Sequence, residues 1–166
     1  MSHFYTLVLV PSDPRIDVRA EVGRLLAPYN EAIEVPEYNR ACYCIGSRQS
    51  PDPECKECHG SGVYATTYSD KAKWDWYKIG GRWNRVCWDE QGRGQLEENT
   101  STVKHLLESG AERSFAVVTP DGLWHESASM GWWAMTSNVN PTWVQEYRQL
   151  LEDNRDCLAV GCDLHI

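Results

Sequence analysis

The chain has 166 residues, a formal net charge of −8 and a hydrophobic content of 42%, which suits one folded domain with a single core. Sequence-independent affinity for DNA or RNA comes from lysine and arginine, so the negative balance argues against non-specific nucleic-acid binding. The sequence contains neither a run of about 20 apolar residues nor a signal-peptide pattern. We therefore expect a cytoplasmic protein with no membrane partner.

The N-terminal part of the sequence predicts a strand followed by a helix. Residues 4–10 read FYTLVLV and are apolar on both strand faces, which is typical of a buried central strand. PSDP then interrupts the pattern. The next apolar residues recur at the spacing of one helical stripe, namely Val18, Val22, Leu25 and Leu26. Pro28 ends the predicted helix.

The middle of the chain loses this apolar periodicity. From Pro36 to Tyr68, Cys, Gly, Pro and Ser dominate, and the segment is too polar to build a core of its own. We interpret 36–68 as a zinc-binding insertion within a single α+β domain spanning 1–166. The tract KWDWYKI at 73–79 then alternates as a strand does, with Trp74, Trp76 and Lys78 on one side, until two glycines interrupt it.

The second half predicts a loop at 89–101, then a short helix in TVKHLLESG with Gly110 as its C-terminal cap. SFAVVT and LWHE flank Pro120-Asp121-Gly122, which indicates a hairpin. MGWWAM at 130–135 reads as another strand or as a loop.

The C-terminal part predicts a last helix and strand. Asn140 suits an N-cap, with Pro141 at the first helical position. The closing LAVGCDLHI alternates as a strand that returns to the sheet. A β–α opening and a β–α–β ending predict a ferredoxin-like α+β fold, with a mainly antiparallel sheet, helices on one face and a zinc-knuckle insertion.

Cysteine spacing predicts a metal site. Cys42, Cys44, Cys55 and Cys58 form a C-x-C and a C-x-x-C pair separated by ten residues, and four thiolates so spaced can enclose one Zn²⁺. A set of four cysteines leaves no open position, so the expected zinc is structural; His59 could replace one of them. The remaining Cys87, Cys157 and Cys162 have no partner spacing and are expected to be buried small side chains.

The second cysteine pair continues as CKECHGSG at 55–62. Residues 42–62 resemble half of a DnaJ-type zinc-binding repeat, whose unit is C-x-x-C-x-G-x-G. The first pair, C-x-C-x-G, departs from that unit. The resemblance therefore implies a zinc knuckle and does not imply chaperone function.

The run KWDWYKIGGRW at 73–83 mixes aromatic rings, basic side chains and a Gly-Gly step. Rings can stack on a base, arginine and lysine can neutralise a phosphate, and glycine lets a ligand approach the main chain. These chemistries predict a small-ligand pocket with the zinc-bearing insertion as one wall. Its candidate residues are Trp74, Trp76, Tyr77, Lys78, Gly80, Gly81, Arg82, Trp83, His125 and Trp132.

The same run, with TPDGLWHE, MGWW and the C-terminal CDLHI, resembles a set of small uncharacterised proteins encoded by bacteriophages and some bacterial genomes. The resemblance implies a viral accessory role. Such proteins often counter host defences by binding a host protein or by sequestering a signalling nucleotide.

Three functions follow from these features. The leading hypothesis is a non-enzymatic protein that binds a small nucleotide-like anion, as a counter-defence factor. The first alternative is an inhibitor that binds a host protein through exposed tryptophans. The second is a nucleotide-processing enzyme. Its available acid/base groups are His125 with Glu126, His105, Asp163 and His165, although no catalytic motif assembles them.

Overall fold

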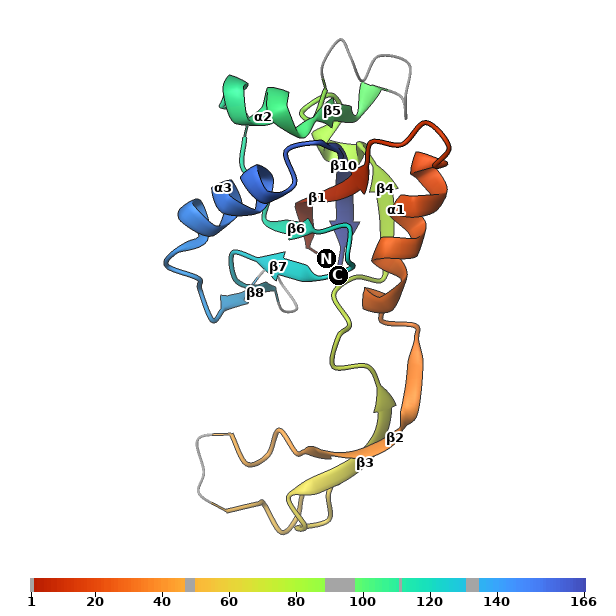
Figure 1. The fold of residues 1–166 in the computed structure, drawn as a ribbon. Helices are drawn as coiled ribbons and strands as arrows, with labels where there is room; N and C mark the ends of the chain where they lie inside the picture. The colour runs from red at the N-terminus through yellow and green to blue at the C-terminus, as the bar shows by residue number, and fades with distance from the viewer. Residues whose placement is uncertain (1, 47–49, 89–97, 111, 131–134) are drawn as a thin grey trace.

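The computed structural model describes residues 2–46, 50–88, 98–110, 112–130 and 135–166. Within these ranges the fold is α+β, with a mixed six-stranded sheet in the order β4-β10-β1-β6-β7 and β5 also paired to β10 (Figure 1). The strands are β1 (His3–Pro11), β4 (Trp76–Ile79), β5 (Thr100–Thr102), β6 (Ala116–Val118), β7 (Trp124–Glu126) and β10 (Cys157–His165).

The two end strands of the chain form the centre of the sheet. β1 and β10 pair antiparallel along their whole length, from His3 opposite His165 to Pro11 opposite Cys157. β1 also pairs in parallel with β6. Because its neighbours lie on both edges, β1 is buried along almost all of its length, as its continuous apolar sequence predicts.

Successive side chains of β1 contact different helices. Phe4, Val8 and Val10 belong to one apolar cluster with helix α1 (Val18–Leu26). Tyr5, Leu7 and Leu9 belong to a second cluster with α2 (Val103–Ser109) and α3 (Trp143–Asp153). Side chains alternate between the two faces of a strand, so helices cover both faces of the sheet. The prediction of helices on one face is wrong.

The strand order also differs from the ferredoxin-like arrangement predicted above. β1 and β6 are parallel and adjacent, whereas a split βαβ unit places another strand between them. The other described pairings in this sheet are antiparallel, so the sheet is mainly antiparallel as expected. The β6–β7 hairpin around Gly122, which has φ of +83°, is confirmed.

A small two-stranded sheet follows this hairpin. It pairs β8 (Ser129–Met130) with β9 (Thr136–Ser137) in the antiparallel sense. Most of the MGWWAM tract, residues 131–134, lies outside the described residues, as does most of the loop predicted at 89–101.

Helix ends follow the expected cap chemistry at two of three helices. Asp17 accepts a hydrogen bond from the Ala20 N–H at the start of α1, and Gly110 ends α2 with a left-handed φ of 64°. Helix α3 begins at Trp143 rather than directly after Asn140. The Asn140 side chain instead accepts a hydrogen bond from the Thr142 N–H, 3.0 Å away, and so forms a turn before the helix.

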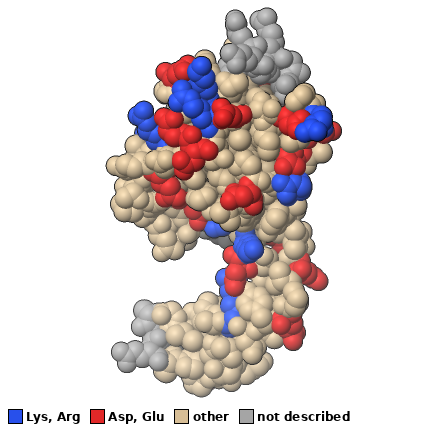
Figure 2. Space-filling view, in the orientation of Figure 1, with Lys and Arg blue, Asp and Glu red and all other residues tan. Residues whose placement is uncertain are grey.

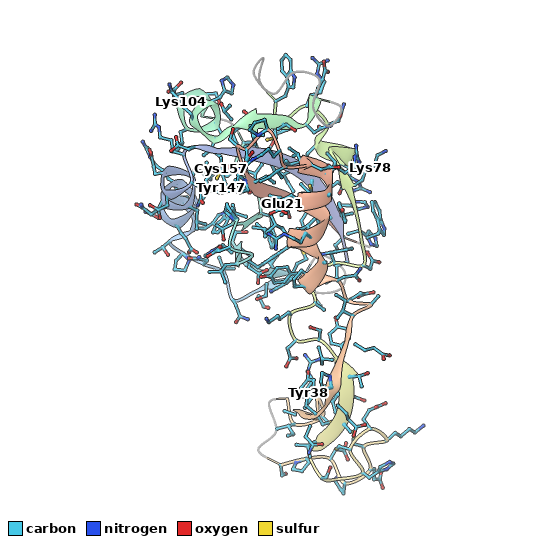
Figure 3. All side chains as sticks on the ribbon, turned by 45° about the vertical axis from the view of Figure 1, so that its right-hand side comes forward. Glu21, Tyr38, Lys78, Lys104, Tyr147 and Cys157 are labelled. Atoms are coloured by element: carbon cyan, nitrogen blue, oxygen red, sulfur yellow. The ribbon has the colours of Figure 1, made fainter. Side chains whose placement is uncertain are left out.

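The insertion forms a separate arm. Strands β2 (Glu34–Ala41) and β3 (Val63–Tyr68) pair antiparallel, and the hairpin extends away from the sheet and its helices (Figure 1). Figure 3 shows Tyr38 on this arm, far from Tyr147 and Cys157 in the body. Backbone hydrogen bonds fix the base: the Lys73 N–H donates to the Tyr29 carbonyl and the Glu31 N–H to the Trp74 carbonyl. We call residues 34–68 the arm.

The chain bends sharply after β4, where the sequence predicts an interruption. Gly80 and Gly81 have φ of +75° and +55°, and a 3₁₀ turn (Gly81–Trp83) follows. A Cβ atom at Gly81 would lie 2.4 Å from the Cβ of Asp163, and one at Gly80 would lie 2.5 Å from the amide nitrogen of Asn99. Two side chains of the protein itself, Asn99 and Asp163, therefore make the close approach to the main chain that the glycines permit.

On the face drawn in Figure 2, positively and negatively charged residues are interspersed over the body. In the part of the chain that the structure describes, no helix has the length and apolar character needed to cross a bilayer.

Replacing Gly81 by alanine is expected to destabilise the fold by about 3 kcal/mol or more, because the new methyl group collides with Asp163 in a left-handed backbone conformation. Gly110→Ala is the matched control: its φ of +64° is similar, but nothing lies within 4 Å of the added Cβ. That control loses only about 1–2 kcal/mol. Urea denaturation measures both, and equal losses would contradict the proposed steric conflict.

Candidate functional site

Four cysteines meet at the far end of the arm. The sulfur atoms of Cys42, Cys44, Cys55 and Cys58 all lie within 4.8 Å of one another. The Cys42–Cys55 and Cys44–Cys58 sulfur pairs are each 3.6 Å apart. A zinc–sulfur bond of about 2.3 Å gives a tetrahedron whose sulfur atoms are about 3.8 Å apart. The cluster therefore has the size that a four-cysteine zinc site requires, and its members are the predicted ones.

Backbone N–H groups point at these sulfur atoms. Burial acts to raise the pKa of the Cys58 thiol, but hydrogen bonds from the N–H groups of Gly62 and Gly60 and from Cys44 outweigh it and lower that pKa to about 7. The Asp52 N–H also donates to the Cys44 sulfur, but burial and the neighbouring thiols of Cys58 and Cys55 raise the pKa of Cys44 overall. Donors of this kind stabilise thiolate, which is the form that binds a metal.

Glycine makes this arrangement possible after the second cysteine pair. Gly60 and Gly62 have φ of +81° and +79°, and a Cβ at Gly62 would come within 3.2 Å of Ile45. The Gly62 carbonyl in turn accepts a hydrogen bond of 2.8 Å from the Cys42 N–H. Gly62 thus links both halves of the cluster. His59 is exposed and is not a member of the described group of ligands.

The aromatic run at 73–83 does not gather in one place. Trp74 is only 6% exposed; its indole N–H donates to the Leu26 carbonyl, 3.1 Å away, and its ring meets Tyr77 edge-on. Both belong to the cluster beneath α1. The predicted alternation placed Trp74 with Trp76, but Trp74 precedes β4 and is positioned by its bridge to Asn30. Trp74 is thus a core residue.

Trp76, Lys78 and Arg82 lie on or near the opposite face. Trp76 is 43% exposed, and its ring stacks on His165 with a centroid distance of 5.2 Å. Lys78 and Arg82 have exposed side chains. The Arg82 backbone N–H donates to Asp163 at 3.0 Å. The structure uses the main chain of Arg82, rather than its guanidinium, in the interior.

Trp83 lies beside a cavity. Its ring stacks on the buried Tyr5, with centroids 5.7 Å apart and an interplanar angle of 18°. Both rings line a cavity of about 690 Å³ between β1, the 3₁₀ turn, the α2–β6 connection and α3. Burial and the neighbouring Cys87 raise the pKa of Tyr5 far above its usual range, so its hydroxyl stays neutral. The cavity also reaches His3 and Arg113.

Two histidine–aspartate pairs stand at this end of the sheet. His3 Nδ1 lies 2.8 Å from Asp163 Oδ1, and His165 Nδ1 lies 2.6 Å from Asp75 Oδ1. The two imidazole rings are neighbours, with centroids 4.9 Å apart. Sequence reasoning named Asp163 and His165 but missed His3 and Asp75. The alternation of the first and last strands could have placed His3 beside His165, given the correct register.

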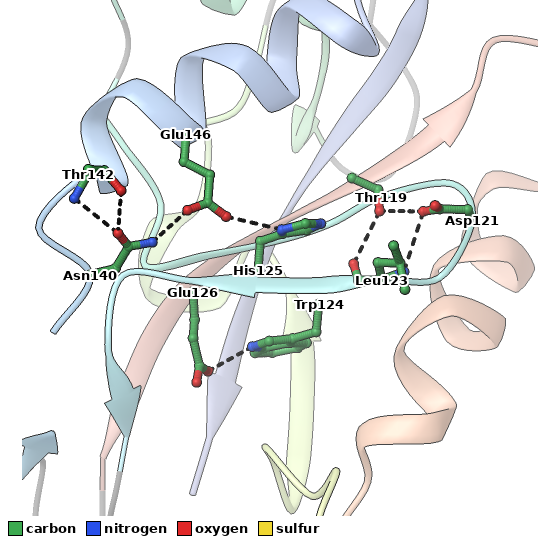
Figure 4. Close-up of polar contacts among 9 residues, drawn as sticks. All are labelled: Thr119, Asp121, Leu123, Trp124, His125, Glu126, Asn140, Thr142 and Glu146. Carbon is green, nitrogen blue, oxygen red and sulfur yellow. Dashed lines mark hydrogen bonds and ion pairs between the residues drawn. The ribbon is translucent and has the colours of Figure 1, made fainter. Parts of the chain in front are cut away.

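His125 belongs to a different region. It lies 3.2 Å from Glu146 of α3, and Glu146 also accepts a hydrogen bond of 2.6 Å from the Asn140 amide (Figure 4). This network ties β7 to α3 next to a smaller cavity of about 380 Å³. On the other side of β7, Glu126 accepts hydrogen bonds from Trp124 and Lys73.

Of the ten predicted ligand residues, Trp83 lines the larger cavity and His125 the smaller one, while Trp132 lies outside the described residues. The arm does not serve as a wall of the larger cavity, because none of its described residues is among those that line it. The four-cysteine cluster and the cavity are thus two separate sites.

Comparisons of the chain with models of protein families, with curated proteins and with solved structures find no match.

Purified protein is expected to carry one equivalent of zinc, bound by the four-cysteine cluster. An isolated two-stranded hairpin is at best marginally stable, so a chelator should increase hydrogen exchange within 34–68 while β1 and β10 remain protected. Elemental analysis and hydrogen-exchange mass spectrometry measure these effects. Cys55→Ser should reproduce the loss, and Cys157→Ser, outside the cluster, should not. Metal-free protein with an equally protected arm would refute the site.

Trp74→Phe is expected to destabilise the protein by about 1–3 kcal/mol, because it removes the hydrogen bond to the Leu26 carbonyl and part of a buried ring. Trp76→Phe is the matched control in the same motif and should change stability by less than about 1 kcal/mol, since its ring is half-exposed. Chemical denaturation compares them, and the reverse ranking would contradict the core position of Trp74.

Proposed function

We propose that the protein binds a small nucleotide-like anion in the cavity lined by Trp83 and Tyr5. The observation that carries the proposal is the fixed position of Trp83: its ring is stacked in parallel on a buried tyrosine and borders a cavity of about 690 Å³. A ring held in this way loses little freedom when a planar base stacks on it. The volume falls in the range of small-molecule sites.

The polar groups around the cavity suit the rest of such a ligand. The exposed guanidinium of Arg113 can pair with a phosphate. Glu112 and Ser127 line the same cavity and can accept hydrogen bonds from sugar hydroxyls. Arg113 is a local cation on a surface whose positive and negative charges are interspersed. Such a surface favours binding of a small anion over binding of a long phosphate backbone.

A role as a viral accessory protein is part of this proposal. A protein that holds a nucleotide in a cavity without releasing it lowers the free concentration of that nucleotide. The resemblance to phage-encoded proteins implies an accessory role, and sequestration of a host signalling nucleotide is one of the two ways in which such proteins counter host defences.

A second candidate function, binding to a host protein, is favoured by the arm. It extends from the body, and its side chains Tyr43 and Val63 are 77% and 45% exposed. A metal-fixed arm with exposed apolar side chains suits docking to another protein. In this alternative the arm, rather than the tryptophan run, provides most of the contact surface.

Isothermal titration calorimetry with AMP, GMP and their 3′,5′-cyclic forms tests nucleotide binding, with ribose 5-phosphate as the ligand that lacks a base. We expect binding of at least one nucleotide and weaker binding of ribose 5-phosphate. Because stacking contributes about 1–3 kcal/mol per base, Trp83→Ala should weaken binding about 5- to 150-fold. Tyr43→Ala, which removes an exposed ring on the arm and outside the cavity lining, should leave affinity within about threefold.

Arg113→Ala should weaken the binding of nucleotides more than that of the free nucleosides, and Arg24→Ala on α1 is the matched charge control. Absence of binding across the panel, together with capture of a defined host polypeptide that depends on residues 34–68, would replace this proposal with the second candidate.

A further inference from the structure

We propose that His3 is a general base at this cavity and that the protein hydrolyses a phosphodiester of the bound nucleotide. This inference rests on the proposed function, since it takes the same cavity as the binding site. It adds a reaction, and it assigns the chemistry to a histidine–aspartate pair that the sequence motifs do not reveal.

The carboxylate of Asp163 is built to orient His3. Asp163 is 2% exposed, and a buried carboxylate is costly unless it is hydrogen-bonded. Its two oxygens have separate partners: Oδ1 faces His3 Nδ1 at 2.8 Å, and Oδ2 accepts the Arg82 backbone N–H at 3.0 Å. The backbone donor fixes the carboxylate through the Gly81 bend, so Asp163 is held independently of His3.

This geometry sets the tautomer of His3. An ionised carboxylate only accepts hydrogen bonds, so Nδ1 of His3 carries the hydrogen and donates it to Asp163. In the neutral ring, Nε2 then holds the lone pair. A histidine oriented by a buried aspartate, with Nε2 available as the proton acceptor, is the arrangement on which many hydrolases rely.

His3 is also placed where a substrate would lie. Its side chain is 11% exposed and lines the larger cavity together with Trp83 and Arg113. A nucleotide whose base stacks on Trp83 and whose phosphate pairs with Arg113 has its phosphorus within the same cavity as His3. None of the other described histidines lines this cavity.

The second histidine–aspartate pair packs against the first and restricts its movement. His165 is fixed by Asp75 through its side chain at 2.6 Å and through the Asp75 N–H, which donates to the His165 carbonyl at 3.0 Å. Trp76 stacks on one side of His165, and His3 meets both rings edge-on. These contacts restrict rotation of the His3 ring, so His165, Asp75 and Trp76 are positioning residues.

The reaction is a hydrolysis in which one water molecule is consumed for each ester bond broken. Nε2 of His3 takes a proton from water, and the water oxygen forms a bond to phosphorus. The opposite P–O ester bond breaks, and its oxygen leaves with the electron pair and takes a proton from solvent. The imidazolium of His3, stabilised by Asp163, then releases its proton to solvent. The products are a phosphomonoester and an alcohol.

The test uses the full-length protein with 3′,5′-cyclic AMP and the dinucleotide ApA as probes. Phosphorus NMR follows conversion of the diester signal to a monoester signal, and calorimetry measures affinity for the same probes. General base catalysis contributes about 10²–10⁴-fold, so His3→Gln should lower turnover by that factor while affinity stays within about threefold. His105→Gln, an exposed histidine of α2, is the matched control and should retain full turnover.

The Asp163→Asn variant tests whether Asp163 orients the His3 ring or only stabilises the fold. The oxygen of the introduced amide can still accept the Arg82 N–H, but the amide nitrogen would donate to His3 Nδ1 and reverse the tautomer. We expect a fall in kcat of about 10²-fold or more with KM and melting temperature little changed. His165→Gln should lower kcat less than His3→Gln does.

Three outcomes decide the matter. Turnover that His3→Gln abolishes, with binding retained, supports the inference. Binding without turnover in the wild-type protein, or turnover that His3→Gln leaves intact, overturns it and leaves the proposed binding function standing. Absence of binding both to these two probes and to the nucleotide panel above, with no turnover, overturns both.

Discussion

The antiparallel pairing of β1 with β10 is the constraint on which the rest of the structure depends. It joins the two ends of the chain in one register, from His3 opposite His165 to Pro11 opposite Cys157. Both strands are buried in their central parts, and a shift of one residue would exchange the side chains that pack beneath α1 with those that pack beneath α2 and α3. The register therefore fixes the two helix layers, and it places both histidines at the same end of the sheet.

The bend at Gly80-Gly81 positions further groups of the proposed site against the strands that this register aligns. Only residues without a Cβ allow the chain after β4 to pass against Asn99 and Asp163. The bend turns the Arg82 N–H toward the Asp163 carboxylate and brings Trp83 back over Tyr5. A stretch that resembles a ligand-binding loop in sequence thus serves first to hold a buried carboxylate and a ring. In the proposed site, its contribution to binding comes from Trp83.

Local patterns predicted the parts of the structure that local physics determines. The apolar run at 4–10 and the helical stripe from Val18 to Leu26 are fixed by burial, and the four cysteines by ligand spacing. The sequence did not predict that Asp163 pairs with His3, because the two residues are 160 positions apart and meet only through the register of β1 and β10. Nor could alternation place Trp74, whose inward position depends on its bridge to Asn30 before β4 begins.

The separation of the arm from the cavity has a thermodynamic consequence. The arm has a small apolar cluster made of the cysteines and Tyr64, whereas the body has two large clusters on either side of the sheet. If the four-cysteine cluster binds the predicted zinc, a hairpin with so little buried apolar surface would depend on that metal for its order, while the body would not. Metal availability would then act on the arm and its exposed Tyr43 without acting on Trp83 or His3. A chain built in this way can couple two binding events only if one partner contacts both the arm and the body.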